Sequence, residues 1–259
     1  MSYRGTTALI TGASAGLGEV FARQWAERGA DVVLVARRLD RLEELAGALK
    51  RRHGITARPL AADLARPGAA AALKTELAER GITVQTLINN AGFGSHGAFA
   101  EQEPEHITRM IQLNVGAVAE LTRTFLPELV ADGRGALVTV ASTAAYQTTP
   151  AMAVYGVKAF VLSLTEALAH ETRRSSLRVL AVSPGPVSTE FFDVVGTQEA
   201  AVGRVSSPAE VVTAARRALE RRRTPPSTVA GLPNRLSSLA PRFAPRRLVL
   251  ATAGRALNA

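Results

Sequence analysis

The stretch "TTALITGASAGLGEVF" (residues 6–21) decides the fold. Its apolar start, "TTALIT", predicts a buried strand, and "GEVFARQWAERG" after it predicts a helix that ends at Gly29. Gly12, Gly16 and Gly18 lie between them and allow a tight turn, where the backbone can approach a pyrophosphate near the free amides of the helix start. Any turn can contain three glycines, but a dinucleotide-binding turn requires this strand before it and this helix after it.

Apolar runs and helical stretches continue to alternate after this turn. Strands that alternate with helices are joined by right-handed crossovers, which predicts an α/β fold with a parallel sheet covered by helices on both faces. Such a sheet binds ligands at the carboxyl ends of its strands. The further strands are predicted in "ADVVLVAR" (30–37), "TARPLAADL" (56–64), "VQTLINNAG" (84–92), "GALVTVAS" (135–142) and "LRVLAVSPG" (177–185).

Length and composition favour a single domain. The 259 residues are 47% hydrophobic, which suits one α/β domain over residues 1–215, with a basic, proline-containing extension over 216–259 packed on it or tethered to it. The absence of cysteine excludes disulfides, a thiol nucleophile and cysteine-ligated metals. No histidine or acidic cluster has metal spacing, so no catalytic metal is expected. Neither a signal peptide nor a membrane-spanning run is recognisable, so a cytoplasmic location is expected.

The net charge of +9 is concentrated near the C-terminus. From residue 216 onward the chain has ten arginines and one acid, Glu220, so this segment alone carries +9 and the rest is neutral. Nucleic-acid binding would need aromatic residues among the basic ones, and the segment has only Phe243, so nucleic acid is not an expected partner. The segment either packs on the domain, pairs with another subunit or contacts an anionic membrane surface. The ten arginines are Arg216, Arg217, Arg221, Arg222, Arg223, Arg235, Arg242, Arg246, Arg247 and Arg255.

The end of the second predicted strand distinguishes between the two nicotinamide cofactors. A cofactor without the 2′-phosphate is usually held there by an acid that binds both ribose hydroxyls. Ala36 occupies that position, and Arg37 and Arg38 follow it. Because a guanidinium suits a phosphate dianion, NADP(H) is favoured over NAD(H), unless both arginines simply face solvent. Asp63, after the third strand, is either an acceptor for the adenine amino group or an exposed loop acid.

Several further motifs follow in order along the chain. They are "NNAG" (89–92), "LN" (113–114), Ser142, Tyr155 and "SPGPVST" (183–189). With the glycine spacing, these motifs make the chain resemble the short-chain dehydrogenase/reductase family, in its short single-domain branch. The resemblance implies a Rossmann-type, doubly wound sheet of about seven strands and hydride transfer between NADP(H) and an alcohol or carbonyl compound. "STAAYQTTPAMAVY" (142–155) is similar to a bacterial subgroup, which narrows the substrate little.

The resemblance also implies roles for individual residues. Ser142 would hydrogen-bond the substrate oxygen, and Tyr155 would be the general acid in reduction and the base in oxidation. Lys158 would lower the tyrosine pKa, which at ~10 is unsuited to neutral pH, and Asn114 would hold a water near the lysine. The expected cofactor-binding residues are Gly12, Ser14, Ala15, Gly16, Leu17, Gly18, Arg37, Arg38, Asp63, Leu64, Asn90, Ala91, Gly92, Tyr155, Lys158, Pro184, Gly185, Val187 and Thr189.

The spacing between the tyrosine and the lysine departs from the family. "VYGVKAFV" (154–161) has Tyr-x-x-Lys where the family has Tyr-x-x-x-Lys. Either spacing leaves both residues on one helix face, so the pair can still act together if the chain winds tightly near Gly156. In an alternative alignment Lys158 keeps its place and Val154 replaces the tyrosine, which would inactivate the site. The apolar residues that must still reach the core are Phe160, Val161, Leu164 and Leu168.

Candidate substrate-binding residues fall in loops near the expected cofactor site, where ordinary packing or solvent exposure is the alternative. We expect an NADP(H)-dependent reductase or dehydrogenase of an apolar ketone, aldehyde or secondary alcohol. A homodimer or homotetramer is expected through the helices of Asn114 and Tyr155. The alternative is a catalytically decayed NADP(H)-binding sensor or scaffold. The candidate substrate-binding residues are Tyr146, His96, Phe191 and Phe192, with Gln147 beside the first.

Overall fold

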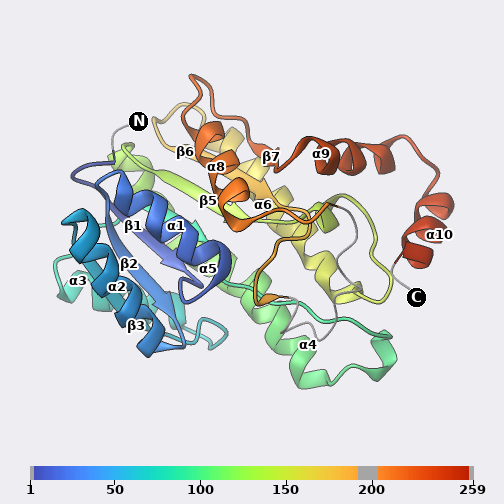
Figure 1. Cartoon of the computed structure of the whole chain (residues 1–259), viewed down its shortest axis with the longest axis horizontal. Helices are drawn as coiled ribbons and strands as arrows, with labels where there is room; N and C mark the ends of the chain where they lie inside the picture. The colour runs from blue at the N-terminus through green and yellow to red at the C-terminus, as the bar shows by residue number, and fades with distance from the viewer. Residues whose placement is uncertain (1–2, 192–203, 257–259) are drawn as a thin grey trace.

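Seven strands form one sheet in which every neighbouring pair is parallel. In the computed structural model, which describes residues 3–191 and 204–256, the strand order is β3-β2-β1-β4-β5-β6-β7 (Figure 1). The predicted α/β fold with a doubly wound parallel sheet is confirmed. The strands are β1 (Thr7–Thr11), β2 (Asp31–Ala36), β3 (Ala57–Ala61), β4 (Thr86–Asn89), β5 (Ala136–Val140), β6 (Arg178–Ser183) and β7 (Ser227–Val229).

The central strands are apolar because helices cover both of their faces. All five residues of β5 and all four of β4 are buried, so neither strand shows the alternation of a half-exposed sheet. The register aligns Leu9 of β1 with Val33 of β2 on one side and with Leu87 of β4 on the other. These side chains belong to the same hydrophobic cluster, which anchors the middle of the sheet.

The helices divide into two layers (Figure 1). α1, α2 and α8 pack on one face, where Phe21, Trp25 and Leu42 are fully buried. α3 and α5 pack on the other face, with α6 beside α5 over β5 and β6. The helices are α1 (Gly16–Glu27), α2 (Leu39–His53), α3 (Ala69–Glu79), α4 (Pro104–Ile111), α5 (Ala117–Asp132), α6 (Lys158–Glu171), α8 (Pro208–Leu219), α9 (Leu232–Leu239) and α10 (Arg246–Ala256).

Short segments of different winding interrupt the helices near the carboxyl ends of the strands. A π-helical turn, η2 (Gln112–Gly116), joins α4 to α5, and a 3₁₀ turn, η4 (Ala153–Val157), leads into α6. Three further 3₁₀ turns are η1 (Phe99–Glu101), η3 (Thr143–Tyr146) and η5 (Ala240–Arg242).

The C-terminal part of the chain both completes the sheet and leaves it. α8 runs across residue 216, and β7 pairs with β6 as the last strand. Beyond β7, residues 232–256 form an arm of α9, η5 and α10 that extends away from the sheet (Figure 1). We call these residues the C-terminal arm. Within the residues described, no helix combines the length and apolar character needed to cross a bilayer.

Candidate active site

A cavity of about 700 Å³ opens at the carboxyl ends of the strands, where the strand order reverses between β1 and β4. The glycine turn after β1 and the segments that follow β2, β4, β5 and β6 line it. Every residue expected to bind a cofactor lines this cavity except Gly18, which lies behind the turn. The fold therefore brings these residues together from positions up to 177 apart in sequence, Gly12 to Thr189.

The glycine turn leaves backbone amides open at the start of α1. A Cβ on Gly18 would lie 2.2 Å from the carbonyl oxygen of Gly12, so this close approach requires glycine. The residue before α1 is Ala15, which makes no side-chain capping bond, so the first N–H groups of the helix lack an internal partner. A helix start of this kind suits the pyrophosphate of a dinucleotide.

Thr11, at the end of β1, fastens the turn to β4. Its Oγ1 accepts hydrogen bonds from the backbone N–H of Asn90 (2.9 Å) and of Ala91 (3.0 Å), and it donates to the carbonyl of Ile88 (3.2 Å). The Asn90 side chain returns a bond to the Thr11 carbonyl at 2.9 Å. Sequence reasoning missed Thr11, although a hydroxyl just before a glycine turn was a usable signal.

Two arginines of the α2 start meet a carboxylate from the segment after β6. The Arg38 guanidinium donates to Ser14 Oγ (3.1 Å) and to Glu190 (3.0 Å), while Arg41 donates to Glu190 at 2.6 Å. Hydrogen bonds from Arg41 and then Arg38 hold the pKa of Glu190 below its usual value. Arg37 lines the cavity beside them. Arg41 and Glu190 were not predicted from the sequence.

Asp63 lies at the edge of the cavity and already has protein partners. Its carboxylate accepts a hydrogen bond from the backbone N–H of Ala65 (3.2 Å) and pairs with Arg109 of α4 at 3.1 Å. The expected contact with an adenine amino group would therefore share this carboxylate with Arg109. No sequence signal linked α4 to the end of β3.

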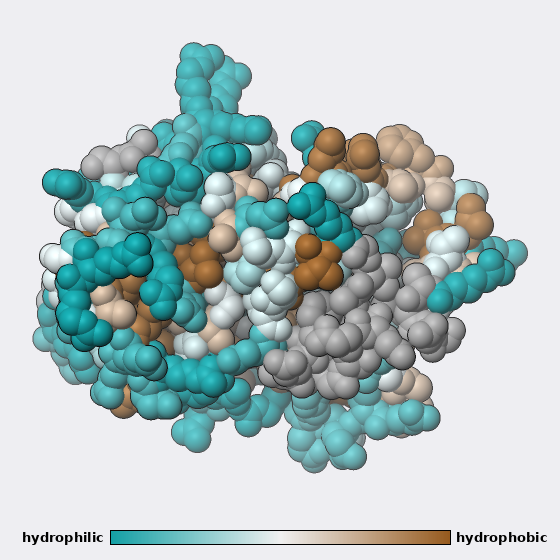
Figure 2. All heavy atoms as spheres, viewed as in Figure 1, coloured by the Kyte–Doolittle hydropathy of each residue, from teal (hydrophilic) through white to brown (hydrophobic). Residues whose placement is uncertain are grey.

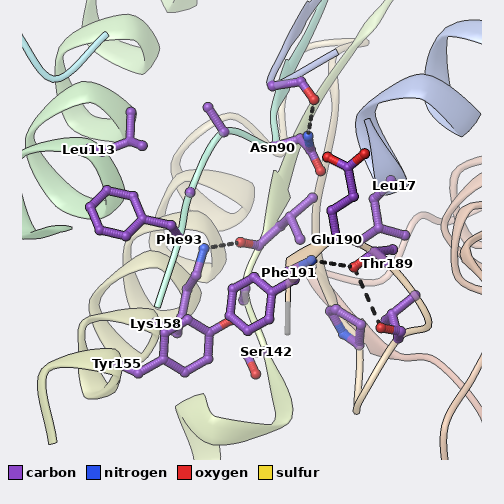
Figure 3. A pocket seen from close by; sticks show the side chains of 18 of the residues that line it. Leu17, Asn90, Phe93, Leu113, Ser142, Tyr155, Lys158, Thr189, Glu190 and Phe191 are labelled. Atoms are coloured by element: carbon purple, nitrogen blue, oxygen red, sulfur yellow. Dashed lines mark hydrogen bonds between the residues drawn. The ribbon is translucent and has the colours of Figure 1, made fainter. Parts of the chain in front are cut away.

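Ser142, Tyr155 and Lys158 converge in the cavity (Figure 3). Ser142 follows β5 and starts η3, where its Oγ accepts a bond from Ala144 N at 3.1 Å. Lys158 is the first residue of α6 and is only 4% exposed. Its Nζ donates to the carbonyl of Val140 at 2.9 Å, which satisfies one of the three ammonium protons.

Tight winding places the tyrosine and the lysine on the same side despite the short spacing. Tyr155 lies in the 3₁₀ turn η4, and α6 begins directly after it. A 3₁₀ helix has 3.0 residues per turn, so residues three apart lie above one another. The expected irregular winding near Gly156 is thus present, and both side chains line the cavity.

The helix after the short spacing reaches the core only in part. Val161 is buried, as expected. Leu168 packs against the hydrophobic cluster of Leu9 and Leu87, also as expected. Leu164 is half-buried. The expectation for Phe160 was wrong, because its side chain is 42% exposed on the outer face of α6. Leu162 takes a buried place instead.

Burial shifts the pKa values of the central pair in opposite directions. It raises the pKa of Tyr155 to about 12, and a hydrogen bond with Ser142 opposes this rise. It lowers the pKa of Lys158 to about 8, because a buried ammonium loses its hydration. The sequence led us to expect a lowered tyrosine pKa; in the protein alone, burial outweighs any such effect.

Asn114 lies behind the cavity wall in the π-helical turn η2. Its Nδ2 donates to the carbonyls of Phe93 (2.8 Å) and Met110 (2.9 Å), whereas its buried Oδ1 has no protein partner. A Cβ on Gly92 would lie 2.5 Å from this Oδ1 and 3.3 Å from Lys158 Nζ. Because glycine has no side chain, there is space beside both polar atoms. This space can hold a hydrogen-bond donor for the buried Oδ1, such as a water molecule.

The predicted substrate-binding residues do not all reach the cavity. Phe191 lines it, with its ring centroid 5.6 Å from that of Tyr155, and Gln147 lines it too. Tyr146 is not part of the cavity wall: its ring packs on the cluster beneath α6, and its hydroxyl lies 3.4 Å from Ser183 Oγ. His96 is half-buried and is not part of the cavity wall. Phe192 lies outside the described residues.

Other residues complete the wall without having been predicted. Phe93 and His106 stack edge to face with centroids 5.1 Å apart, and Ala253 reaches the wall from the C-terminal arm. Leu113 and Met152 add apolar surface. Across residues 3–191 and 204–256, no group of histidine and acidic side chains is arranged to hold a metal ion.

Comparison with known proteins agrees with this geometry. A model of the short chain dehydrogenase family matches residues 6–200. The chain belongs to the short-chain dehydrogenase family. Oxidoreductase UcpA of Escherichia coli K12 is 33% identical over 224 residues, which cover 85% of this chain and 82% of that protein.

Solved structures of the family resemble the whole described fold. A short-chain dehydrogenase from Sphingobium yanoikuyae in complex with NADPH is 36% identical, with a TM-score of 0.81 over 95% of both chains. A structure of a 7β-hydroxysteroid dehydrogenase is 27% identical, with a TM-score of 0.86 over 97% of this chain and 98% of that one.

The Thr11 hydroxyl predicts a measurable effect on stability. Thr11→Val leaves the N–H groups of Asn90 and Ala91 without their acceptor, which is expected to lower the free energy of unfolding by about 1–3 kcal/mol. Urea unfolding measures this. Thr11→Ser keeps the hydroxyl and is the control; if serine destabilises the protein as much as valine, the hydroxyl has no such role.

Proposed function

We propose that the protein is an NADPH-dependent reductase of apolar ketones and aldehydes. The observation that carries the proposal is a protonated Tyr155 beside Ser142, in a cavity whose opposite wall forms a cradle for a dinucleotide. The family is one of oxidoreductases, and the matched Sphingobium structure holds NADPH. Burial keeps the proton on Tyr155 at neutral pH, so the phenol carries a proton that can be donated to a carbonyl oxygen.

In the proposed mechanism the chain's own residues position and protonate the substrate. A bound nicotinamide would supply the hydride to the carbonyl carbon. Ser142 donates a hydrogen bond to the carbonyl oxygen, and Tyr155 transfers its phenolic proton to that oxygen as negative charge develops. The Lys158 ammonium, held by Val140, stabilises the tyrosinate that remains. Asn114 Oδ1 is suited to a water that returns a proton from the lysine side.

The cavity wall supports an apolar substrate. Phe93, Leu113, Met152 and Phe191 give the cavity wall apolar surface, and Phe191 packs beside Tyr155. Sites of this kind bind the apolar body of a ligand and orient it through a few polar contacts. The relative named a 7β-hydroxysteroid dehydrogenase is consistent with a sizeable apolar substrate.

The direct test is NADPH oxidation with a panel of diketones, aryl ketones and aldehydes. The native chain is expected to reduce at least one class, and Tyr155→Phe to lower kcat by about 10²–10⁴-fold because the proton donor is lost. Binding of NADPH to Tyr155→Phe, measured by fluorescence, controls for folding. A variant with one alanine inserted after Gly156 restores the family spacing. If only that variant is active, the protein is a decayed NADP(H)-binding sensor or scaffold.

The pH dependence of reduction is expected to report Lys158. As pH rises through about 8 the lysine loses its proton and its positive charge, while Tyr155 stays protonated to about 12. We expect kcat/KM for a ketone at saturating NADPH to be constant below this pKa and to fall about tenfold per pH unit above it. Lys158→Arg keeps the charge, so its profile lacks the break. A break that persists in Lys158→Arg would assign it to another group.

We also propose that Arg37 and Arg38 recognise the 2′-phosphate, which favours NADP(H) over NAD(H). Glu190 supports the proposal, since it shows that an anion binds between Arg38 and Arg41 at this place. The ion pairs are half-exposed and therefore weak, so a phosphate dianion is able to replace the carboxylate.

Cofactor affinities test this preference. Arg38→Ala is expected to weaken NADPH binding about tenfold or more and to leave NADH binding within about threefold. Glu190→Gln removes the competing carboxylate and is expected to tighten NADPH binding alone. Glu44→Gln on α2 changes the same charge at an exposed position away from the cavity and is the control. Equal effects on NADPH and NADH would contradict recognition of the phosphate.

A further inference from the structure

The first helix of the C-terminal arm has its polar side buried and its apolar side exposed. Asn234 and Ser238 of α9 are only 5% and 4% exposed. Leu232 and Leu236 on the same helix are 68% and 61% exposed, and Leu239 continues their stripe. A helix on a protein surface normally has the reverse arrangement. The stripe is therefore a surface that requires a partner.

The exposed apolar surface continues along the arm. Figure 2 shows hydrophobic side chains gathered over α9 and α10. Phe243, between these helices, is 87% exposed, and Leu248 and Leu250 of α10 are about half-exposed. Six of the eleven exposed large hydrophobic residues recorded for the described chain thus lie in the arm. The arm is also basic, because no acidic residue follows Glu220.

Both ends of the arm are tied to the active-site cavity. Asn234 packs on Gly185, where a Cβ would lie 2.5 Å from its Nδ2, and Gly185 belongs to the cavity wall. Ala253 of α10 also belongs to that wall. Whatever covers the arm therefore lies next to the mouth of the cavity.

Among the described residues, one surface of the body has chemistry complementary to the arm. Residues 98–105, which we call the acidic lobe, include Phe99, which at 59% is the most exposed large hydrophobic residue outside the arm in the described part of the chain. Glu101, Glu103 and Glu105 flank it and are exposed. None of the ion pairs recorded between described residues involves these glutamates. The next residue, His106, lines the cavity, so the lobe also borders its mouth.

We propose that the C-terminal arm binds the acidic lobe of a second copy of this chain. Phe243 and the leucines of one arm cover Phe99 of the other copy, and the arm's arginines pair with the lobe's glutamates. In a two-fold dimer both arms make this contact, so each cavity mouth is bordered by the partner's arm. An anionic bilayer fits less well, because it would repel the three glutamates beside the same mouth.

Thiol cross-linking tests this contact directly, because the chain has no cysteine of its own. Phe99→Cys and Phe243→Cys are prepared separately, mixed and treated with a short bismaleimide. The mixture is expected to form at least about fivefold more covalent dimer than either variant alone, since only the mixture pairs the lobe with the arm. No excess of dimer in the mixture overturns the proposal. A chain that carries both Phe99→Cys and Phe243→Cys also overturns it if its cross-links form only within one chain, because the arm then covers the lobe of its own chain.

Charge reversal distinguishes a specific contact from loose association. Glu101→Lys with Glu103→Lys is expected to lower the cross-linking yield about fivefold, and adding Arg246→Glu with Arg247→Glu to restore it. Arg222→Glu with Arg223→Glu makes the same charge change outside the arm and is expected to have no effect. If charge reversal leaves the cross-linking yield unchanged, the arginines of the arm do not pair with the glutamates of the lobe. Arm-dependent sedimentation with phosphatidylserine vesicles, without cross-linked dimer, would instead assign the arm to lipid.

Discussion

The Thr11 hydroxyl holds the two strands between which the sheet changes direction. β1 and β4 are neighbours, yet the chain leaves them toward opposite faces, so a cleft must open just beyond their ends. One oxygen accepts two amide hydrogen bonds from Asn90 and Ala91, directly after β4, and the glycine turn starts at the next residue. The helix start, the arginines at the start of α2 and the proposed catalytic residues after β5 all border the cavity at this junction. A shift of β4 against β1 would displace every wall of the cavity.

The regular part of this arrangement was predictable from the sequence, because it depends on local patterns. Buried parallel strands are continuous apolar runs, and the glycine turn has few other conformations open to it. What local patterns do not give is the direction of side chains outside regular helices and strands. Tyr146 in a 3₁₀ turn and His96 in a loop lie outside the cavity wall, because tertiary packing sets their direction. Glu190 and Arg41 meet across 149 residues of chain, so no local pattern contains their contact.

Two of the proposed catalytic residues lie where regular helix geometry is lost. Asn114 occupies a π-helical turn and Tyr155 a 3₁₀ turn. The side-chain Oδ1 of Asn114 in the wider turn has no protein partner, and the tighter turn aligns Tyr155 with Lys158. Burial of the same pair raises the pKa of Tyr155 and lowers the pKa of Lys158. The winding of the turn thus sets the geometry of the pair, and its burial sets the ionisation.

The 3₁₀ turn before α6 has a consequence for how such chains are recognised. A search for the fixed pattern Tyr-x-x-x-Lys would reject this sequence, since it counts residues rather than positions in space. This sequence has one residue fewer between the tyrosine and the lysine than the family pattern. The 3₁₀ turn nevertheless places both side chains in the cavity wall. In this chain both side chains still line the cavity, whereas Phe160 two residues further along is turned toward solvent.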